Sequence, residues 1–327
     1  MSTPKNILIA PLDWGLGHAS RCIPLIYDYL QKNNNVIVGG TKETNDLIVG
    51  EFPELRYVEI PGYAIEYDFS DGNEKSQLPV IVKQIPKILK AIKREHLWLK
   101  EFASKQPLDL IISDNRYGMW HKDIESIFIT HQLFLQTPWR FVDFHRFILH
   151  LTRNFNSIWI PDFKDTVNNL SGDLSHKKPL PSARFKFIGP LSRFSINHTA
   201  KTVNPAYDYI AIASGPKEQR EMFAQKIIEK AQVNKSEKGI LVLGEIHSKD
   251  ELSKPLPNLE IYNHLPANEF KIKLLQSRKV IAACSYSTIM DLFVLDKLKD
   301  AELFPVKGQT EQEYLYSHLQ KYFYKND

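Results

Sequence analysis

The stretch NILIAPLDWGLGHASR, residues 6–21, opens the N-terminal half with an apolar run and a glycine-containing turn. The run Asn6 to Ala10 predicts a buried β-strand, and the apolar period from Cys22 to Leu30 predicts a helix after it. Gly15 and Gly17 allow a tight turn between them and close approach of the backbone to a ligand. Because a helix N-terminus offers free N–H groups and a positive dipole end, we expect either a phosphate-facing loop or an ordinary βα turn here.

Further along the chain, β-rich runs alternate with segments long enough for a helix, which is the pattern of parallel sheets. A stretch with glycine and proline but no apolar period, Gly189 to Pro205, interrupts this alternation and predicts a linker. We therefore expect an α/β protein with two Rossmann-like domains, 1–190 and 206–327, joined by the linker 191–205, with their parallel sheets facing a central cleft. The predicted strands are 6–10, 36–39, 55–60, 108–113, 126–130, 157–161, 185–188, 209–213, 240–243, 259–262, 280–283 and 301–304.

The composition is that of an ordinary globular protein. Of 327 residues, 43% are hydrophobic and 24% are charged, which excludes a disordered chain, collagen and a small disulfide scaffold. Cys22 and Cys284 match no metal-binding or redox spacing. The sequence has neither a signal-peptide pattern nor an apolar run of transmembrane length, so we expect a cytoplasmic protein. A net charge of +4 gives no reason to expect nucleic acid as a partner.

A second stretch with ligand-binding character runs from Cys284 to Leu292. Ser287 and Thr288 follow a predicted strand at the start of a helix, where hydroxyl and backbone N–H groups together hold a phosphate. Asp291 falls about one turn later, where a carboxylate accepts hydrogen bonds from two ribose hydroxyls. The alternative is an ordinary helix cap followed by an acidic residue.

The loops after the first-half strands supply candidate catalytic groups. His18 is a candidate general base at the start of a helix, and the carboxylates of Asp13 and Asp114 are rivals for that role or would orient the histidine. Parallel strands end at the same edge of a sheet, so residues after two further strands should open there as well. These are Asn115, Arg116 and His131; Arg21, Arg116 and Arg220 are candidates for neutralising phosphate. We expect no metal, because no D-x-D element stands out and a helix N-terminus can take over its electrostatic role.

Four motifs occur in order along the chain: Gly15 to His18, Ser214 to Arg220, Tyr286 to Leu292 and Gly308 to Leu315. Together they resemble the glycosyltransferases related to the peptidoglycan N-acetylglucosaminyl transferase, which have the GT-B fold. The resemblance implies inverting transfer of a sugar, an N-acetylhexosamine by analogy, from a nucleotide diphosphate sugar such as a UDP-sugar. The acceptor would be a glycan or a lipid-linked molecule held mainly by the N-terminal domain.

The resemblance also assigns roles to individual residues. Ser287 and Thr288 would contact the diphosphate, Asp291 the ribose, and Gln309 and Gln312 the donor sugar or its phosphates. The remaining donor-binding predictions are Gly15, Gly17, Ser214, Gly215, Arg220 and Leu265, and the acceptor-binding predictions are Asn115, Arg116 and His131. The nucleotide sugar is a substrate, and no cofactor is expected.

Two departures from the family pattern keep other functions open. Ser285 stands where relatives usually have glycine, and Lys297 to Glu302 replaces the usual segment before the last strand. A side chain at a glycine position matters if the backbone needs a positive φ or must approach phosphate. A nucleotide-sugar 2-epimerase and a catalytically inactive nucleotide-sugar-binding protein are therefore the alternative functions.

Two segments of the N-terminal domain are candidates for contact with a membrane. Leu78 to Phe102 is expected to be an amphipathic helix that Pro86 either kinks or begins, with Leu89 on its apolar face. Seven basic and two acidic residues lie between Lys83 and Lys105. The segment Phe134 to Phe155 mixes aromatic and basic residues. Either both pack in the core or groove, or they bring the protein to an anionic membrane surface as a peripheral protein of the inner face.

Overall fold

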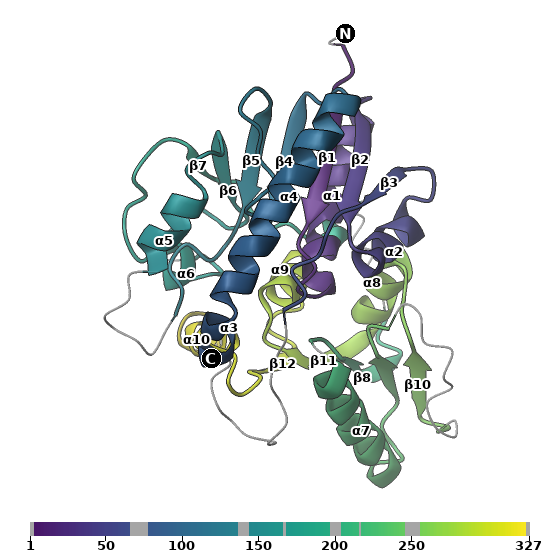
Figure 1. The fold of residues 1–327 in the computed structure, drawn as a ribbon. Coiled ribbons are helices and arrows are strands. Elements are labelled where there is room, and N and C mark those ends of the chain that lie inside the picture. The colour runs from purple at the N-terminus through teal and green to yellow at the C-terminus, as the bar shows by residue number, and fades with distance from the viewer. Residues whose placement is uncertain are drawn as a thin grey trace.

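The computed structural model describes residues 3–65, 78–136, 144–165, 168–196, 204–215, 217–245 and 256–324. Within these residues the chain forms two parallel sheets, each flanked by helices (Figure 1). The first sheet has the strand order β3-β2-β1-β4-β5-β6-β7 and the second β10-β9-β8-β11-β12. The α/β class with two Rossmann-like domains is thus confirmed.

The first sheet lies in the N-terminal domain. Its strands are β1 (Asn6–Pro11), β2 (Asn35–Gly40), β3 (Arg56–Glu59), β4 (Leu110–Asp114), β5 (Glu125–Ile129), β6 (Ser157–Ile160) and β7 (Phe185–Phe187). The helices are α1 (Leu16–Gln31), α2 (Lys42–Glu51), α3 (Leu78–Lys83), α4 (Ile85–Lys105), α5 (Phe144–Leu151) and α6 (Asp173–His176), and the short 3-10 turn η1 (Arg193–Ser195) follows. The central strands are almost wholly buried because apolar residues fill both of their faces.

The second sheet consists of β8 (Tyr207–Ile212), β9 (Gly239–Val242), β10 (Leu259–Tyr262), β11 (Ser277–Ala283) and β12 (Ala301–Phe304). Its helices are α7 (Lys217–Val233), α8 (Ala267–Leu275), α9 (Tyr286–Val294) and α10 (Thr310–Tyr322). Every predicted strand is present, with ends within three residues of those predicted. The predicted linker 191–205 falls between the two sheets, and residues 197–203 of it lie outside the described part of the chain.

The two domains share a continuous hydrophobic core. One cluster of buried residues includes Ile9 and Ile26 of the N-terminal domain together with Ile289 and Leu292 of the C-terminal domain. The last helix, α10, returns to the N-terminal domain: the Tyr314 hydroxyl accepts a hydrogen bond from the Asp173 N–H, 2.6 Å away. Figure 1 shows α10 beneath the first sheet and α9 between the sheets. The C-terminal residues therefore tie the domains together.

Two predicted helices differ from the structure. The first begins at Leu16 rather than Cys22, because Gly15 alone provides the left-handed turn (φ 109°) and Gly17 already lies within the helix. The segment from Leu78 divides at Gln84 into α3 and α4, and Pro86 lies in the first turn of α4, where proline is tolerated. Leu89 is 43% exposed, so its predicted place on the apolar face is wrong.

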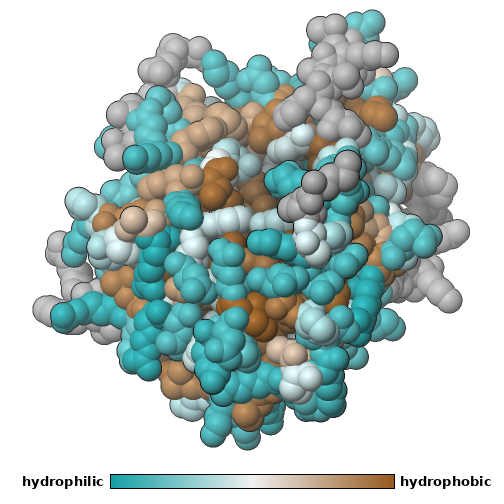
Figure 2. Space-filling view, turned by 90° about the horizontal axis from the view of Figure 1, so that it is seen from above, coloured by the Kyte–Doolittle hydropathy of each residue, from teal (hydrophilic) through white to brown (hydrophobic). Residues whose placement is uncertain are grey.

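Hydrophobic residues reach the surface in separate places. The face in Figure 2 is largely hydrophilic, with hydrophobic patches scattered among the polar side chains. Among the described residues, no helix is both long and apolar enough to cross a membrane. Part of the segment Phe134 to Phe155, residues 137–143, lies outside the described chain, while Phe134 and Phe155 themselves are buried in the core.

Candidate active site between the domains

The site lies where the strand order of the first sheet reverses. β1 and β4 are neighbours, although the crossovers after them leave in opposite directions, and Pro11 pairs with Asp114 at their carboxyl ends. In open α/β sheets this switch point is the usual ligand-binding position. The first turn of α1 brings His18 beside Asp114, with 3.1 Å between His18 Nδ1 and Asp114 Oδ2. The predicted meeting of these two residues is therefore present.

Asp114 is held by Arg21, one helical turn after His18. Arg21 Nε donates to Asp114 Oδ2 at 2.7 Å, and its NH2 group donates to Oδ1. Burial by itself raises the pKa of Asp114, but the charges of Arg21 and His18 outweigh it and lower the pKa to about 2. Asp114 is fully buried and remains ionised, so it orients Arg21 and His18 and is not itself a base for a substrate.

His18 is the member of this group that reaches solvent, with 17% of its side chain exposed. Its burial and the positive charge of Arg21 both lower its pKa, and together they outweigh the opposite effect of Asp114. The imidazole is therefore neutral at pH 7. A neutral ring in a partly open cleft can accept or donate one proton, depending on its tautomer.

His131 continues the network into the C-terminal domain. Its Nε2 lies 2.7 Å from Oε1 of Glu311, in the first turn of α10. Its ring stacks on Tyr286 of α9, with centroids 4.1 Å apart and an angle of 9° between the planes. The Tyr286 hydroxyl donates to the Pro161 carbonyl, so Tyr286 is inserted between N-terminal strand ends. The predicted acceptor residue His131 is thus largely buried at the domain interface.

Glu311 is a member of this network with no role predicted from the sequence, although it lies inside the Gly308 to Leu315 motif. Its signal was present: an acidic residue in the first turn of a helix that begins after a strand end. Burial tends to raise the pKa of Glu311, but the His131 contact lowers it overall, so the carboxylate stays ionised at pH 7.

The N-termini of α1 and α9 meet at close range. A Cβ atom placed on Gly17 would lie 2.6 Å from Ser287 Oγ, so a side chain at this position would push the Ser287 hydroxyl aside. Ser285 is the N-cap of α9 with φ −83°, and its hydroxyl accepts from the Thr288 N–H at 3.4 Å. Ser285 therefore causes no backbone strain. It does occupy an N–H group that a phosphate at this helix end would use.

Asp291, predicted to bind ribose, is engaged by the linker. Ser192 Oγ donates to its Oδ1 at 2.6 Å, and Arg193 Nε donates to its Oδ2 at 3.2 Å. Burial raises the pKa of Asp291, and Arg193 only partly offsets this. Of the Asp291 side chain, 11% remains exposed to a ligand.

Other predicted donor-binding residues form a chain of amides and backbone groups. Gln312 Nε2 donates to Gln309 Oε1 at 2.7 Å, and Gln309 Nε2 donates to Gln219 Oε1 at 3.3 Å. Arg220 NH1 donates to the Gly215 carbonyl at 2.8 Å. The starts of α7 and α10 are thus brought together, with Ser214 next to Gly215 on the loop after β8.

Leu265 packs in the core, and the segment Lys297 to Glu302 forms a turn that leads into β12. The Leu265 side chain is 2% exposed in the core, which leaves only its backbone for a ligand. The replaced segment forms a stable turn: Asp296 takes the left-handed conformation (φ 55°), and Lys297 Nζ donates to Asp300 Oδ2 at 2.9 Å. The strand that follows, β12, pairs in parallel with β11 along its whole length.

Arg116 is a correction to the predicted acceptor site. Its side chain is fully buried, and its guanidinium donates to Glu95 Oε1 at 2.6 Å and to the Pro11 carbonyl at 2.7 Å. No part of it is accessible to an acceptor. Asp13 accepts from the Tyr63 N–H at 3.1 Å and keeps 12% of its side chain exposed. Asn115 ends β4 in the left-handed conformation (φ 58°) and is half-buried beside the site.

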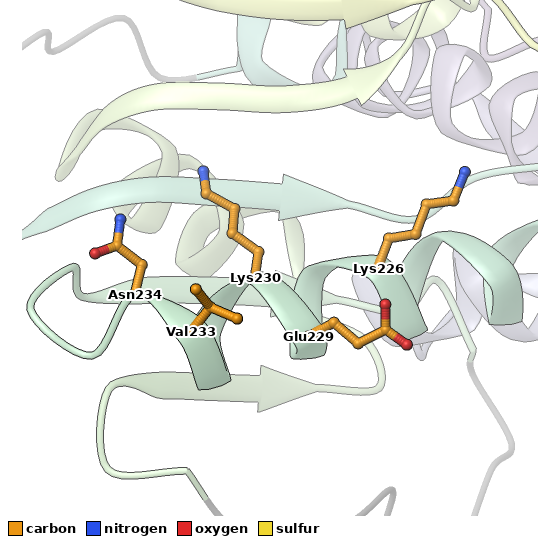
Figure 3. A pocket seen from close by; sticks show the side chains of 5 residues that line it. All are labelled: Lys226, Glu229, Lys230, Val233 and Asn234. Carbon is orange, nitrogen blue, oxygen red and sulfur yellow. The ribbon is translucent and has the colours of Figure 1, made fainter.

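Two surface cavities of about 510 and 630 Å³ lie along α7. The first is an open groove lined by Lys226, Glu229, Lys230, Val233 and Asn234, as Figure 3 shows. The second includes Arg220 and Glu245. Neither cavity is lined by a residue of the group His18, Arg21, Asp114, His131 and Glu311. In the described part of the chain, no group of three or more His, Cys, Asp or Glu side chains is arranged to hold a metal ion.

A scan of protein-family models finds no match, and neither does a search of curated proteins. Solved structures, by contrast, resemble the whole chain. The calicheamicin glycosyltransferase CalG4 shares 14% identity over 98% of this chain and 84% of its own, with a TM-score of 0.59. UGT89C1 of Arabidopsis thaliana, solved with UDP-L-rhamnose, shares 15% over 98% and 83%, with a TM-score of 0.61.

The spinosyn rhamnosyltransferase SpnG shares 11% identity over 96% of this chain and 84% of its own, with a TM-score of 0.62. At such identities the likeness shows the fold and not the activity. The chain has the fold of GT-B glycosyltransferases. None of these three structures is a peptidoglycan transferase, so the more specific resemblance remains a prediction.

Proposed function

We propose that this protein is a glycosyltransferase that moves a sugar, by analogy an N-acetylhexosamine, from a nucleotide diphosphate sugar to a glycan or lipid-linked acceptor with inversion. The observation that carries the proposal is the meeting of two helix N-termini at the switch points of two parallel sheets, beside the His18–Asp114 pair. Helix N-termini stabilise the growing negative charge of a leaving diphosphate. The same edge carries the His18 imidazole and the Asp13 carboxylate, one of which must take the proton of an acceptor hydroxyl.

Calorimetric titration with UDP, GDP, TDP and UDP-N-acetylglucosamine tests the donor site. We expect one nucleotide to bind, and Asp291→Asn to weaken its binding by about 1 to 3 kcal/mol because a charged acceptor of ribose hydroxyls is lost. Ser192→Ala is the matched control, since it removes the linker's hydrogen bond to the same carboxylate and leaves the charge in place. Absence of binding by all four ligands would contradict the proposal and favour a binding or scaffold role.

A more sensitive variant at this site is Ser285→Gly. In the wild type the Thr288 N–H donates a hydrogen bond to the Ser285 hydroxyl. The substitution removes this hydroxyl, so the N–H group becomes available to a phosphate oxygen. We expect tighter binding of the nucleotide, by up to about tenfold for one added hydrogen bond, with a loss of only a few tenths of a kcal/mol in helix capping. Weaker or unchanged binding would place the diphosphate elsewhere.

Two alternative activities are separated by their products. A nucleotide-sugar 2-epimerase would convert the donor sugar without any acceptor, and NMR of the donor after incubation with the protein alone would show it. An inactive binding protein would bind nucleotide and leave the donor unchanged whatever acceptor is offered. We favour transfer because the His18–Asp114 pair lies in the domain expected to hold the acceptor.

We further propose that α4 brings the enzyme to an anionic membrane surface, where a lipid-linked acceptor resides. Leu89 and Leu97 are 43% and 56% exposed on this helix. Exposed basic residues surround them: Lys90, Lys93, Arg94 and Lys100. Co-sedimentation with phosphatidylglycerol vesicles should be strong for the wild type and weak for Leu89→Ser/Leu97→Ser. Met222→Ser, which changes an exposed residue of α7, is the control. Recovery of the wild type wholly in the supernatant would contradict this role.

A further inference from the structure

Arg21 contacts two histidines, His18 and His131, and in each ring it meets the Nδ1 atom. Its NH2 group lies 2.8 Å from His18 Nδ1, and its NH1 group lies 3.3 Å from His131 Nδ1. Its Nε and NH2 groups also donate to the carboxylate of Asp114. The guanidinium is buried and its donors form a rigid planar fork, so one side chain fixes both rings.

A guanidinium has no lone pair, and this determines the protonation of each ring nitrogen that it contacts. To accept a hydrogen bond from Arg21, Nδ1 of each histidine must carry a lone pair, which puts the ring proton on Nε2. The other contact of His131 agrees with this state. Its Nε2 lies 2.7 Å from Oε1 of Glu311, and an ionised carboxylate only accepts hydrogen bonds.

His18 has a second neighbour that favours the opposite tautomer. Asp114 Oδ2 lies 3.1 Å from His18 Nδ1, and a proton on Nδ1 would satisfy that contact. The same proton would face an N–H group of Arg21 across only 2.8 Å between the nitrogen atoms. Asp114 already receives two hydrogen bonds from Arg21 and has no need of a third. The balance of contacts therefore favours the proton on Nε2.

We infer that Arg21 is a positioning residue that makes His18 a hydrogen-bond donor toward the cleft. With Nδ1 turned to Arg21 and Asp114, the Nε2–H group is on the far side of the ring. His18 belongs to the first turn of α1, whose N-cap Gly15 provides no side-chain hydrogen bond to the N–H groups there. A site lined by hydrogen-bond donors binds an oxygen anion, such as a phosphate oxygen of a nucleoside diphosphate. A hydroxyl that must lose its proton needs an acceptor instead, and Asp13 is the remaining candidate for that role.

The inference rests on the proposed function only for the identity of the ligand. The tautomer is a property of the protein alone, so it is measured on the free protein at pH 7 by ¹⁵N NMR of labelled histidine. We expect a lone-pair nitrogen signal for Nδ1 of His18 and an N–H signal for Nε2, assigned by their loss in His18→Gln. A protonated Nδ1 in the wild type would overturn the inference.

Two lysine variants test whether Arg21 is the cause. Arg21→Lys keeps the charge but loses the fork, so the proton of His18 should move to Nδ1 and bond Asp114. Arg116→Lys is the matched control, because Arg116 is the other buried arginine beside β4 and pairs with Glu95. It should leave the His18 signals unchanged. An unchanged tautomer in Arg21→Lys would overturn the role of Arg21. If that variant does not fold, the wild-type signals decide.

Binding of UDP and uridine tests the ligand. His18→Leu removes the donor and should weaken UDP about tenfold while leaving uridine unchanged. His18→Gln restores an N–H donor and should recover most of the UDP affinity. Equal UDP affinity in His18→Leu and the wild type would overturn the donor role. If neither UDP, GDP nor TDP binds the wild type, the proposed function fails, and the tautomer result stands by itself.

Discussion

Two arginine–carboxylate pairs lie near the carboxyl end of β4, and they differ in their surroundings. Arg116 and Glu95 are both fully buried, and their other partners, such as Tyr63, belong to the same domain. Arg21 and Asp114 are equally buried, but their network includes the partly exposed His18 and, through His131, Glu311 of the other domain. A closed network fixes one conformation, whereas a network that ends at a cleft can meet a ligand.

The difference teaches that burial of a charge does not by itself mark function. Glu95 receives hydrogen bonds from Tyr63, Gly118 and Arg116, which satisfy its carboxylate within the core and fix α4 against the loop after β4. The Glu95 carboxylate itself is thus inaccessible to a substrate, and the contact of this network nearest the surface is the 3.7 Å pair between Arg116 NH2 and Asp13 Oδ1. The Arg21 network leaves one imidazole nitrogen of His18 at a solvent-facing edge. We therefore expect the Arg116–Glu95 network to determine stability and the Arg21–Asp114 network to determine activity.

The largest effect is expected where the closed network is broken. Glu95→Ala leaves the guanidinium of Arg116 buried without its carboxylate, which costs about 3 to 5 kcal/mol in the free energy of unfolding. Urea denaturation measures this loss. Glu101→Ala on the same helix is the control, since Glu101 forms an exposed pair with Lys105 and its removal should leave the transition in place. Equal stability of the two variants would contradict the comparison.

The open network should respond in activity rather than stability. His18→Leu removes the partly exposed imidazole of this network, and we expect kcat/KM for transfer to fall roughly 10²- to 10³-fold, the usual loss for a catalytic donor or base. His121→Leu is the control, because His121 precedes β5 at the opposite end of the sheet. A His18→Leu enzyme with wild-type kinetics would show that this network is structural, like the other.

The sequence predicts the strands and the meeting of His18 with Asp114, for a clear physical reason. Each strand is a short apolar run between polar or turn residues, and parallel strands deliver the residues after them to one edge. That rule also assigned Arg116 to the site, wrongly. Its burial depends on Glu95, which lies among basic residues on a distant helix, and no local pattern reveals such a pairing.

The contacts between the domains are equally hidden from local patterns. Glu311 meets His131 because α10 returns to the N-terminal domain, and Asp291 meets Ser192 because the linker folds over α9. Both depend on how two separately predictable units pack. The prediction for Leu89 is wrong for a related reason: the buried face of α4 consists of Ala91, Leu99 and the charged Glu95, and an apolar period cannot reveal a face that includes a carboxylate.

The smallest expected effect is a difference in pH dependence between the two carboxylates. Burial is the main cause that raises the pKa of Glu95 to about 6, against the opposing effect of Arg116. The pKa of Asp114 is lowered to about 2. Between pH 4.5 and 6 the folded protein therefore binds the Glu95 proton more tightly than the unfolded chain does. The stability from Asp114 is present above pH 4 and lost as the pH falls toward 2.

Glu95→Gln isolates the first of these effects. As the pH falls from 7 to 5, the wild type should gain about 1 kcal/mol of stability relative to this variant, because a pKa shift from 4.5 to about 6 takes effect only partly by pH 5. Urea denaturation of both proteins at the two pH values measures the change, and Asp114 cancels because it stays ionised in both. A relative loss for the wild type on acidification would mean that Arg116 outweighs burial. The closed network would then resemble the open one in its electrostatics, and only the exposure of His18 would distinguish them.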